Sequence, residues 1–446
     1  MDAAPISLQP IDGGALYGDG SSGGTAPLLQ ANQPSSCTLG TRCRLRLATL
    51  NVRGFGRARA SGVSDKWLAI NQIMKDHRLA ILAVQEAHLD EERLSTLKNL
   101  FAAQLTIIAS SNPRNPGGAE GVAFVVSNKI LSHGQPVCEE IVPGRASLIS
   151  VPWTATKAIK ILNVYAPNRP DENAAFWDKL GELTEGRAAL RPDVLCGDFN
   201  VTEDAIDRLP SRSDNALLVE ALLRLIGRWN MRDTWRRANP TARDYTYLQL
   251  ATGARSRIDR IYTRSSLTQA VADWKICPMG SLTDHSMMSL SLANYHAPKV
   301  GQGRWALPVD LLDDAPFTDV MRQLGEGLQK ELDAAVGRSE TCNPQTLLAA
   351  FKRKLRSAAR DRLKVRTAKR ELREKKLRDQ IVTELQRPVE RNGDETAVVE
   401  TAALLQTELT RVQDRSFEIT KMRAAAKDWA YGERIGKYWI RMNREP

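Results

Sequence analysis

The segment Val194–Asn200, with the sequence Val-Leu-Cys-Gly-Asp-Phe-Asn, is the one around which the other motifs are arranged. Its apolar residues 194–196 predict a buried strand that ends at a glycine, where the backbone can turn sharply. Asp198 and Asn200 are two residues apart and so share one face of an extended chain, whereas Phe199 points into the core. A carboxylate and an amide fixed side by side can deprotonate and orient a water molecule. The same residue types are common in turns, so the segment alone leaves both interpretations open.

Five further motifs place polar side chains at or near the ends of predicted strands. They contain Asn51 (Thr-Leu-Asn-Val-Arg-Gly), Glu86 (Val-Gln-Glu), Tyr165 (Asn-Val-Tyr-Ala-Pro), Asp259 (Ser-Arg-Ile-Asp) and the pair Asp284-His285. Each has an ordinary structural explanation as a cap, a loop acid, a packing residue or an ion pair. Together they supply what phosphodiester hydrolysis needs: oxygen ligands for a hard divalent metal, a base for water, a phosphate donor and an acid that orients the histidine.

Residues 44–295 have the pattern of one folded domain. Short apolar runs alternate with helical patterns, which predicts an α/β domain of sheets covered by helices. We expect strands at 45–52, 79–85, 121–127, 147–151, 159–165, 194–196, 245–250 and 258–262, and helices at 66–77, 91–101, 172–185 and 215–228.

The two ends of the chain differ from this domain in composition. Residues 1–43 are rich in Gly, Ser, Pro and Ala and predict a disordered tail. Residues 296–342 read as a connector, and residues 343–446 predict a basic helical hairpin with helices at 344–386 and 395–431. The second helix carries a coiled-coil seam at Val398, Ala402, Leu405, Leu409 and Val412, which we expect to pack within the hairpin.

The net charge of +11 is concentrated in residues 351–379, which hold 14 Lys and Arg against 4 Asp and Glu. Unpaired like charges destabilise a helix, so this excess favours a polyanionic partner, DNA or RNA, over a merely solvated face. A nuclear localisation signal is another interpretation of the same stretch. We expect Lys352, Arg353, Lys354 and Arg356 to contact nucleic acid.

Composition also limits the classes of protein to consider. The 446 residues leave room for two domains, or for one large domain with appendages. Six cysteines scattered singly offer no convincing zinc site and are typical of a reduced, intracellular protein. No apolar run approaches the length of a membrane span, and no secretory signal is visible. We therefore expect no membrane partner, and a nuclear location if the source is eukaryotic.

The order of the motifs resembles the endonuclease/exonuclease/phosphatase superfamily over about residues 44–293. The resemblance implies a two-sheet α/β sandwich with a metal site at one end, followed here by the helical extension. Branches that cleave sphingomyelin, inositol phosphates or poly(A) usually carry a histidine where this chain has Tyr165. The motif Asn-Val-Tyr-Ala-Pro instead resembles the apurinic-endonuclease branch and the endonuclease of LINE-type (non-LTR) retrotransposons.

Four segments favour the retrotransposon group. Ile-Asp-Arg at 206–208 follows the Gly-Asp-Phe-Asn motif, and Asp-Tyr-Thr at 244–246 precedes Ser-Arg-Ile-Asp, both as in that group. Residues 301–308 resemble the segment between endonuclease and reverse transcriptase, and residues 431–439 resemble the stretch just before the polymerase. No Tyr/Phe-x-Asp-Asp motif is present, so we expect no reverse transcription by this chain. It resembles the front portion of an element, a degraded copy or a gene-model fragment.

The resemblance implies specific roles at the metal and the attacking water. Glu86 holds Mg²⁺, for which Mn²⁺ is a possible substitute, and Asn51 lies close by as a ligand or positioning group. Asp284 is a second ligand of the metal or of water. Asp198 is the general base, and Asn200 orients the water or the phosphate.

The remaining implied roles concern the phosphate and the DNA. His285 donates a hydrogen bond to a non-bridging phosphate oxygen, and Asp259 fixes the tautomer of the imidazole. Tyr165 directs its hydroxyl at the phosphate or the leaving oxygen. Thr246 and Arg53 contact DNA. The product is a nick in double-stranded DNA with 3′-hydroxyl and 5′-phosphate ends, which in this group primes reverse transcription.

Two other functions compete with a retroelement endonuclease. A repair enzyme would prefer abasic sites to intact duplex, and a catalytically silent remnant would only bind nucleic acid. A phosphatase for small molecules agrees less well with Tyr165 and the basic helix. Target preference depends on loop shapes, such as that of residues 111–118, which the sequence does not reveal.

Overall fold

The computed structural model describes residues 44–58, 64–131, 135–153, 158–249, 251–293, 305, 307–308, 311–334, 339, 343–386 and 395–432. The predicted tail, residues 1–43, lies outside the described residues, as does most of the polymerase-like segment 431–439.

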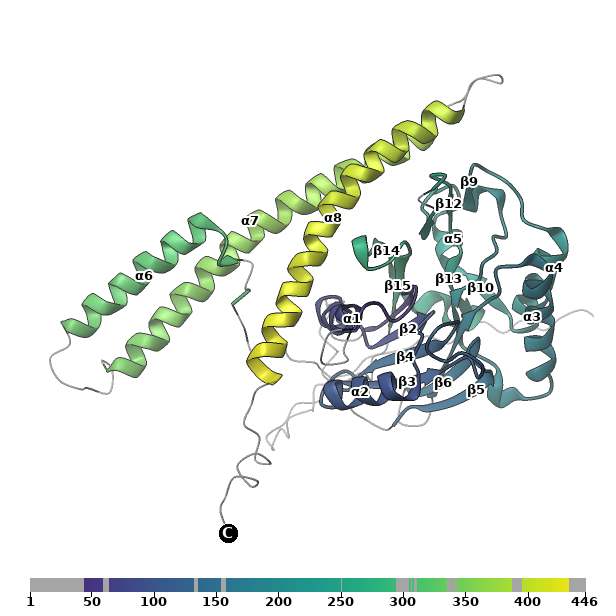
Figure 1. Cartoon of the computed structure of the whole chain (residues 1–446), viewed down its shortest axis with the longest axis horizontal. Coiled ribbons are helices and arrows are strands. Elements are labelled where there is room, and N and C mark those ends of the chain that lie inside the picture. Colours follow the sequence, from purple (N-terminus) through teal and green to yellow (C-terminus); the bar gives the residue numbers. More distant parts are fainter. Residues whose placement is uncertain are drawn as a thin grey trace, which may run out of the picture. The chain divides into compact units, whose positions relative to one another are not determined.

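Two six-stranded mixed sheets form the body of the fold (Figure 1). The first has the strand order β14-β15-β1-β2-β4-β3, and the second has the order β10-β13-β8-β7-β6-β5. The strands of the first sheet are β1 (Arg44–Asn51), β2 (Ile81–Gln85), β3 (Leu105–Ser110), β4 (Val122–Ser127), β14 (Val271–Pro278) and β15 (Ser286–Ala293). Those of the second are β5 (Val137–Val142), β6 (Ala146–Pro152), β7 (Ala158–Tyr165), β8 (Val194–Asp198), β10 (Met231–Asp233) and β13 (Asp259–Arg264).

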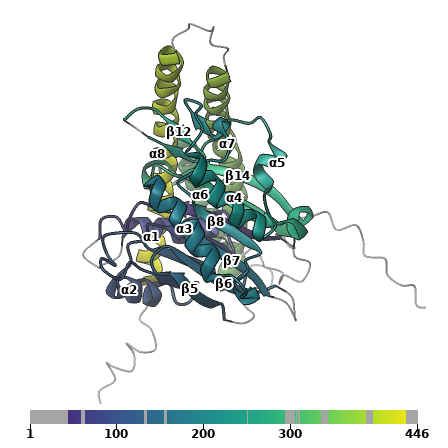
Figure 2. The same ribbon diagram turned by 90° about the vertical axis from the view of Figure 1, so that its right-hand side faces the viewer.

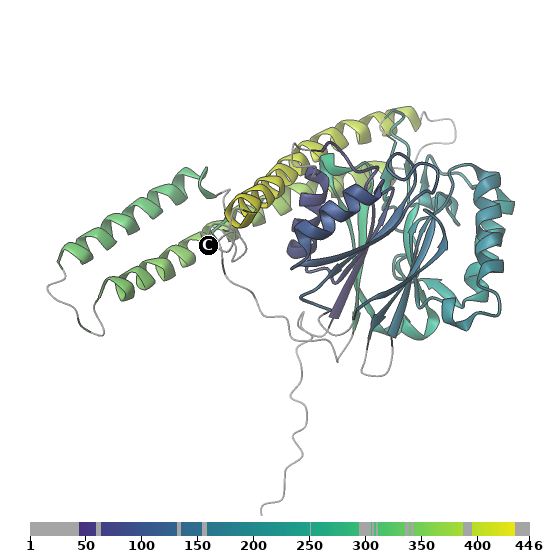
Figure 3. The same ribbon diagram turned by 60° about the horizontal axis from the view of Figure 1, so that its bottom comes forward.

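The core between the sheets is built from alternate residues of the central strands. Leu45 and Leu47 of β1 pack there with Ile161 of β7 and Cys196 of β8. Ala48 and Leu50, on the other face of β1, pack against the helices instead. Because both faces of the strand are buried, β1 is a nearly continuous apolar run. The two layers are seen in Figure 3.

Helices cover the outer faces of both sheets. Helices α1 (Asp65–Asp76) and α2 (Glu91–Phe101) supply apolar residues to the core of the first sheet, and α3 (Pro170–Leu183) and α4 (Ala216–Arg228) to that of the second. Figure 2 shows α3 and α4 side by side on that face. A short helix, α5 (Thr234–Ala238), follows β10, and a small third sheet contains β9 (Arg208–Leu209), β11 (Tyr247–Leu248) and β12 (Arg255–Ser256). The predicted two-sheet sandwich is therefore confirmed.

Every predicted strand has a counterpart, but the prediction omitted several strands, most of them at sheet edges. β5 is an edge strand with two glutamates and mostly exposed or half-buried residues, so it lacks the alternation that marks a half-buried strand. The omitted strands also include β3, β10, β14 and β15. The predicted strand 245–250 was too long, because within its described residues, 245–249, Tyr247–Leu248 alone pairs as a strand.

The helical extension contains α6 (Ala315–Asp333), α7 (Pro344–Gln386) and α8 (Glu395–Gly432). The predicted bounds of the two long helices agree with α7 and α8 within one residue, whereas α6 occupies part of the predicted connector. Leu377 of α7 packs on Leu409 of α8, with Ala402 and Ile381 in the same cluster, so the predicted seam faces its own hairpin. No helix in the described part of the chain is long and apolar enough to cross a membrane.

Candidate active site

Strand register brings the predicted site residues to one end of the sandwich. The parallel pair β7–β8 sets Tyr165 beside Asp198, and the antiparallel pair β8–β13 sets Asp259 beside Asp198. Asn51 is the last residue of β1 in the facing sheet, and His285 directly precedes β15. Residues separated by up to 234 positions in sequence are thus collected at one edge.

Asn51 links two carboxylates from different strands. Its Nδ2 donates to Glu86 Oε1 at 2.8 Å and to Asp198 Oδ2 at 2.9 Å. Its Oδ1 accepts the backbone N–H of Arg53 at 2.9 Å. Both Asn51 and Asp198 are buried. The sequence left Asn51 open as a metal ligand or as a positioning group. In this arrangement Asn51 positions the two acids, and its Oδ1 is engaged by the N–H of Arg53.

The environment of Asp198 suits a general base. Burial raises the pKa of Asp198 to about 7, and the negative charge of Asp259 acts in the same direction. The hydrogen bond from Asn51 and the positive charge of His285 oppose this rise. A carboxyl whose pKa lies near neutrality can both accept and release a proton at physiological pH.

His285 forms an acid–histidine pair with Asp259. Its Nδ1 lies 2.8 Å from Asp259 Oδ2, and both side chains are buried. Burial alone would lower the pKa of His285, but the Asp259 carboxylate raises it to about 9. The imidazole is therefore protonated near neutral pH, and its Nε2–H is available as a hydrogen-bond donor.

The donor atoms fit a divalent metal at Glu86 better than at His285. Asp198, Asp259 and His285 have ligand-type atoms within 4.8 Å of one another. However, Asp259 already engages Nδ1 of His285, and the raised pKa keeps that ring protonated. The carboxylate of Glu86, which Asn51 holds beside Asp198, is the kind of hard oxygen donor that Mg²⁺ and Mn²⁺ prefer.

Tyr165 and Asn200 lie beside this carboxylate group. Burial raises the pKa of Tyr165 far above that of a free phenol, and its hydroxyl is hydrogen-bonded to Glu86, so it stays protonated. Asn200 adopts a left-handed conformation, with φ of 52°, and its backbone N–H donates to Asp198 Oδ1 at 3.1 Å. Its side-chain Nδ2 donates to the Ala166 carbonyl at 2.9 Å, so in this structure Asn200 holds Asp198 in place through its backbone.

Thr246 lies in the interior of the protein and not on a surface that DNA could contact. Its side chain is buried, and its Oγ1 accepts the backbone N–H of Asp259 at 2.9 Å. Its carbonyl accepts the N–H of Ser286 at 2.6 Å. Thr246 thus joins the strand that carries Asp259 to the strand that follows His285. This placement does not favour the predicted contact with DNA.

Arg53 and Asp284 are paired with each other. Arg53 Nη1 lies 2.6 Å from Asp284 Oδ2, and the arginine side chain is 65% exposed. Lys66 donates to the carbonyl oxygens of Val52 at 2.5 Å and Arg53 at 3.0 Å, which holds this loop in place. The carboxylate of Asp284, which the sequence predicts as a ligand of the metal or of water, is therefore engaged in an ion pair. The exposed side of Arg53 remains accessible to a phosphate.

The four predicted nucleic-acid contacts on α7 lie near α6. Lys354 is 3.6 Å from Glu331 of α6, and the guanidinium of Arg356 lies 5.9 Å from the centre of the Trp305 ring. Lys352 and Arg353 are exposed on the same turn of α7. None of the four lines the cavity that contains His285.

The sequence analysis missed three side chains that support the site. The Arg145 guanidinium lies 4.9 Å from the centre of the Tyr165 ring and donates to the Tyr165 carbonyl at 3.2 Å. The ring of Tyr247 lies 4.8 Å from that of His285. Tyr247 directly follows the quoted Asp-Tyr-Thr motif, which was the available signal, whereas nothing local marks Arg145.

Asp207 is the third, and it organises a buried cluster of charges behind Asp259. Arg257 donates to both its oxygens at 2.7 Å, and Arg236 also donates to it. Arg260 lies 3.6 Å away and donates to the Arg257 carbonyl. These bonds fix the backbone on both sides of Asp259. The Ile-Asp-Arg motif was noted in the sequence, but its role was not.

Several known proteins resemble this chain. The Xenopus laevis Transposon TX1 uncharacterized 149 kDa protein is 32% identical over 192 residues, which are 42% of this chain and 14% of that protein. This chain thus matches only a small part of the relative's length.

Three solved structures with similarity to this chain each cover 56% of it. They include an AP endonuclease from Archaeoglobus fulgidus (18% identity, 99% of that chain, TM-score 0.44) and the AP endonuclease LMAP from Leishmania major (17%, 88%, 0.46). They also include the endonuclease domain of TRAS1, a telomere-specific non-LTR retrotransposon (14%, 99%, 0.40).

The family model that matches spans residues 48–285, which is more than half of the chain and includes the motifs from Asn51 to His285. The chain belongs to the Endonuclease/Exonuclease/phosphatase family.

Proposed function

We propose that the chain is a divalent-metal-dependent DNA endonuclease that nicks target DNA as part of a non-LTR retrotransposon protein. The observation that carries the proposal is the position of Asp198. It is a buried carboxyl with a pKa of about 7, held by Asn51 and adjacent in register to the acid of the Asp259–His285 pair. Family membership supports a hydrolase, and the similarity to the TX1 protein supports the retroelement origin.

The side chains divide the reaction between them. Asp198 accepts a proton from a water molecule, whose oxygen forms a bond to phosphorus while the bond from phosphorus to the 3′ oxygen breaks. Protonated His285 donates a hydrogen bond to a non-bridging oxygen, where negative charge grows in the transition state. The Tyr165 hydroxyl donates a hydrogen bond to the phosphate or the leaving 3′ oxygen. The leaving oxygen takes its proton from solvent water, and Asp198 afterwards releases its proton to solvent.

Glu86 would hold Mg²⁺ or Mn²⁺, which when bound neutralises charge on the phosphate and the leaving oxygen. Asn51 keeps Glu86 and Asp198 at a fixed separation and thereby orients the base. Arg53, exposed at the edge of the site, is the candidate for a contact with a neighbouring phosphate.

The test is nicking of supercoiled plasmid with Mg²⁺, with Mn²⁺ and without metal. We expect metal-dependent conversion to open circles, and a rate lower by about 10²–10⁴-fold in Asp198→Asn and His285→Ala. Asp178→Asn is the matched control, because Asp178 is an exposed acid whose partner within the described residues is Arg224, on the helical face. Absence of nicking by the folded wild-type chain would overturn the proposal.

A duplex with a single abasic site separates the retroelement endonuclease from a repair enzyme. The proposed function predicts comparable cleavage of intact and abasic duplex. Strong preference for the abasic site would identify a repair endonuclease instead.

A further inference from the structure

A cavity of about 1990 Å³ lies beside the active site. Asp284, His285 and Tyr247 contribute to its wall, and α7 and α8 line its other side. Pockets for small ligands usually have about 300–1,000 Å³. The size and the position of this cavity therefore indicate a polymeric ligand that extends away from the reacting phosphate.

Contacts with the endonuclease domain fix the helical hairpin at this cavity. Leu209 and Tyr245 pack into the cluster formed by Leu377 and Leu409. Arg255 Nη2 donates to Gln406 Oε1 of α8 at 2.9 Å. The far wall of the cavity is thus held by apolar packing and by a hydrogen bond.

Cations recur along the face of α7 that lines the cavity. Arg366 and Arg373 each lie three or four residues from both Lys369 and Arg370, which places the four cations on one side of the helix. Arg366 lies 3.7 Å from Asp314 and Arg373 lies 3.4 Å from Glu408. Within the described residues, Lys369 and Arg370 have no carboxylate at ion-pair distance.

A second, independent feature of the wall is an unsatisfied polar side chain. Gln413 of α8 is only 6% exposed, and its Nε2 has no hydrogen-bond partner among the described residues. Gln413 lines the same cavity. Because a buried N–H group without a partner is costly, a phosphate oxygen or a water molecule that enters the cavity would satisfy this donor.

We propose that the face of α7 formed by Arg366, Lys369, Arg370 and Arg373 binds backbone phosphates of the DNA beside the cut site. The inference rests on the proposed function, because it takes DNA as the substrate. It assigns the contact to this part of α7 instead of the turn at residues 352–356, which packs near α6. Phosphate contacts supply affinity and set the register of the duplex without reading its sequence.

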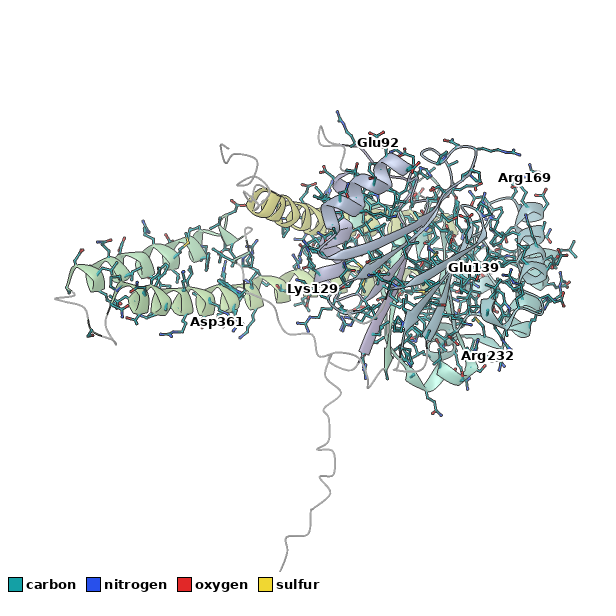
Figure 4. All side chains as sticks on the ribbon, turned by 90° about the horizontal axis from the view of Figure 1, so that it is seen from below. Glu92, Lys129, Glu139, Arg169, Arg232 and Asp361 are labelled. Atoms are coloured by element: carbon teal, nitrogen blue, oxygen red, sulfur yellow. The ribbon has the colours of Figure 1, made fainter. Side chains whose placement is uncertain are left out.

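The test compares two double variants of the full chain. Lys369→Gln/Arg370→Gln removes the two cations of this face that lack an ion pair. The control, Arg360→Gln/Lys364→Gln, removes two exposed cations from the opposite side of the same helix. Lys364 contacts Asp361 there, and the Asp361 side chain is labelled on α7 in Figure 4. Binding of a 30-base-pair duplex is measured against salt concentration, and nicking is measured as kcat and KM separately.

We expect Lys369→Gln/Arg370→Gln to weaken binding roughly tenfold or more at 0.1 M salt and to reduce the salt slope by about two. KM should rise while kcat at saturating DNA stays unchanged, and the control should behave like the wild type. Equal effects in both variants, or none in the first, would overturn this surface. A wild type that binds DNA with this dependence but does not nick it would support the surface and refute the endonuclease.

Discussion

Asp259 and His285 form a buried pair in which Nδ1 of the imidazole lies 2.8 Å from the Asp259 carboxylate. Asp259 comes from the second sheet and His285 directly precedes β15 of the first, so the pair spans the two layers. The carboxylate raises the pKa of His285, which keeps the ring protonated, and leaves Nε2–H free as the donor that the proposed function assigns to the phosphate. Asp259 therefore acts as a positioning residue for His285.

Asp259→Asn should lower the nicking rate by about 10²–10⁴-fold, because the amide no longer stabilises the imidazolium or fixes its orientation. The pKa of His285 should fall below its value of about 9 in the wild type. NMR titration of the imidazole in metal-free buffer measures this shift, which a merely structural role would not produce. An unchanged histidine pKa would contradict the assignment.

Thr246→Val should weaken both the fold and the reaction. The substitution leaves the buried N–H of Asp259 without its acceptor, which costs about 1–3 kcal/mol of unfolding free energy. Chemical denaturation measures this loss, and kcat should fall more than KM rises, because Asp259 is displaced and not the DNA. Thr246→Ser retains the hydroxyl and should restore both quantities. If instead KM changed alone, Thr246 would be a DNA contact, as the sequence first suggested.

Asp207→Asn should destabilise the fold by about 3–5 kcal/mol, because the buried arginines lose their shared counter-ion. Burial alone would raise the pKa of Asp207, but the hydrogen bonds and charge of Arg257 hold it below the usual value of 3.8. The stability gained from this depressed pKa is present above pH 3.8 and is lost as the pH falls through the lower, folded value.

Urea denaturation between pH 3 and pH 7 measures this dependence. The wild type should lose stability at the acid end, and Asp207→Asn should show a flatter profile there. Asp178→Asn is again the control, because its carboxylate is exposed and its pair with Arg224 contributes little. A parallel acid profile in Asp207→Asn and the wild type would exclude the proposed role of this carboxylate.

Gly280→Ala should loosen the docking of α8 beside the active site. Gly280 has φ of 59°, and a Cβ there would lie 3.3 Å from the backbone carbonyl of Gln413. Gly186 has φ of 66° and open space around its Cβ position, so Gly186→Ala reproduces the backbone strain alone. Both variants should lose about 1 kcal/mol from strain. Only Gly280→Ala should also increase hydrogen exchange in α8, and equal exchange in both variants would count against this docking.

The sequence alone determined much of the fold and pointed to the polar residues that strand register collects at one end of the sandwich. Strand alternation and the apolar run before Asp198 are local patterns, and so is the seam of α8. Gly197 is a residue whose type is required by the packing of two strands. Its φ is 143°, and a Cβ there would lie 1.9 Å from the Val164 carbonyl oxygen. Only glycine permits β7 and β8 to approach in this way.

Only the tertiary structure decided how the polar groups are paired. Asn51 meets Asp198 across 147 positions, and Arg53 meets Asp284 across 231, so no local period encodes either contact. The same holds for the buried hydroxyl of Thr246 and for the cationic face of α7 that lines the cavity. Residue type and spacing specify which groups can ionise or donate. Strand register and helix docking specify which partner each group meets, because packing of the two sheets brings distant segments within hydrogen-bonding distance.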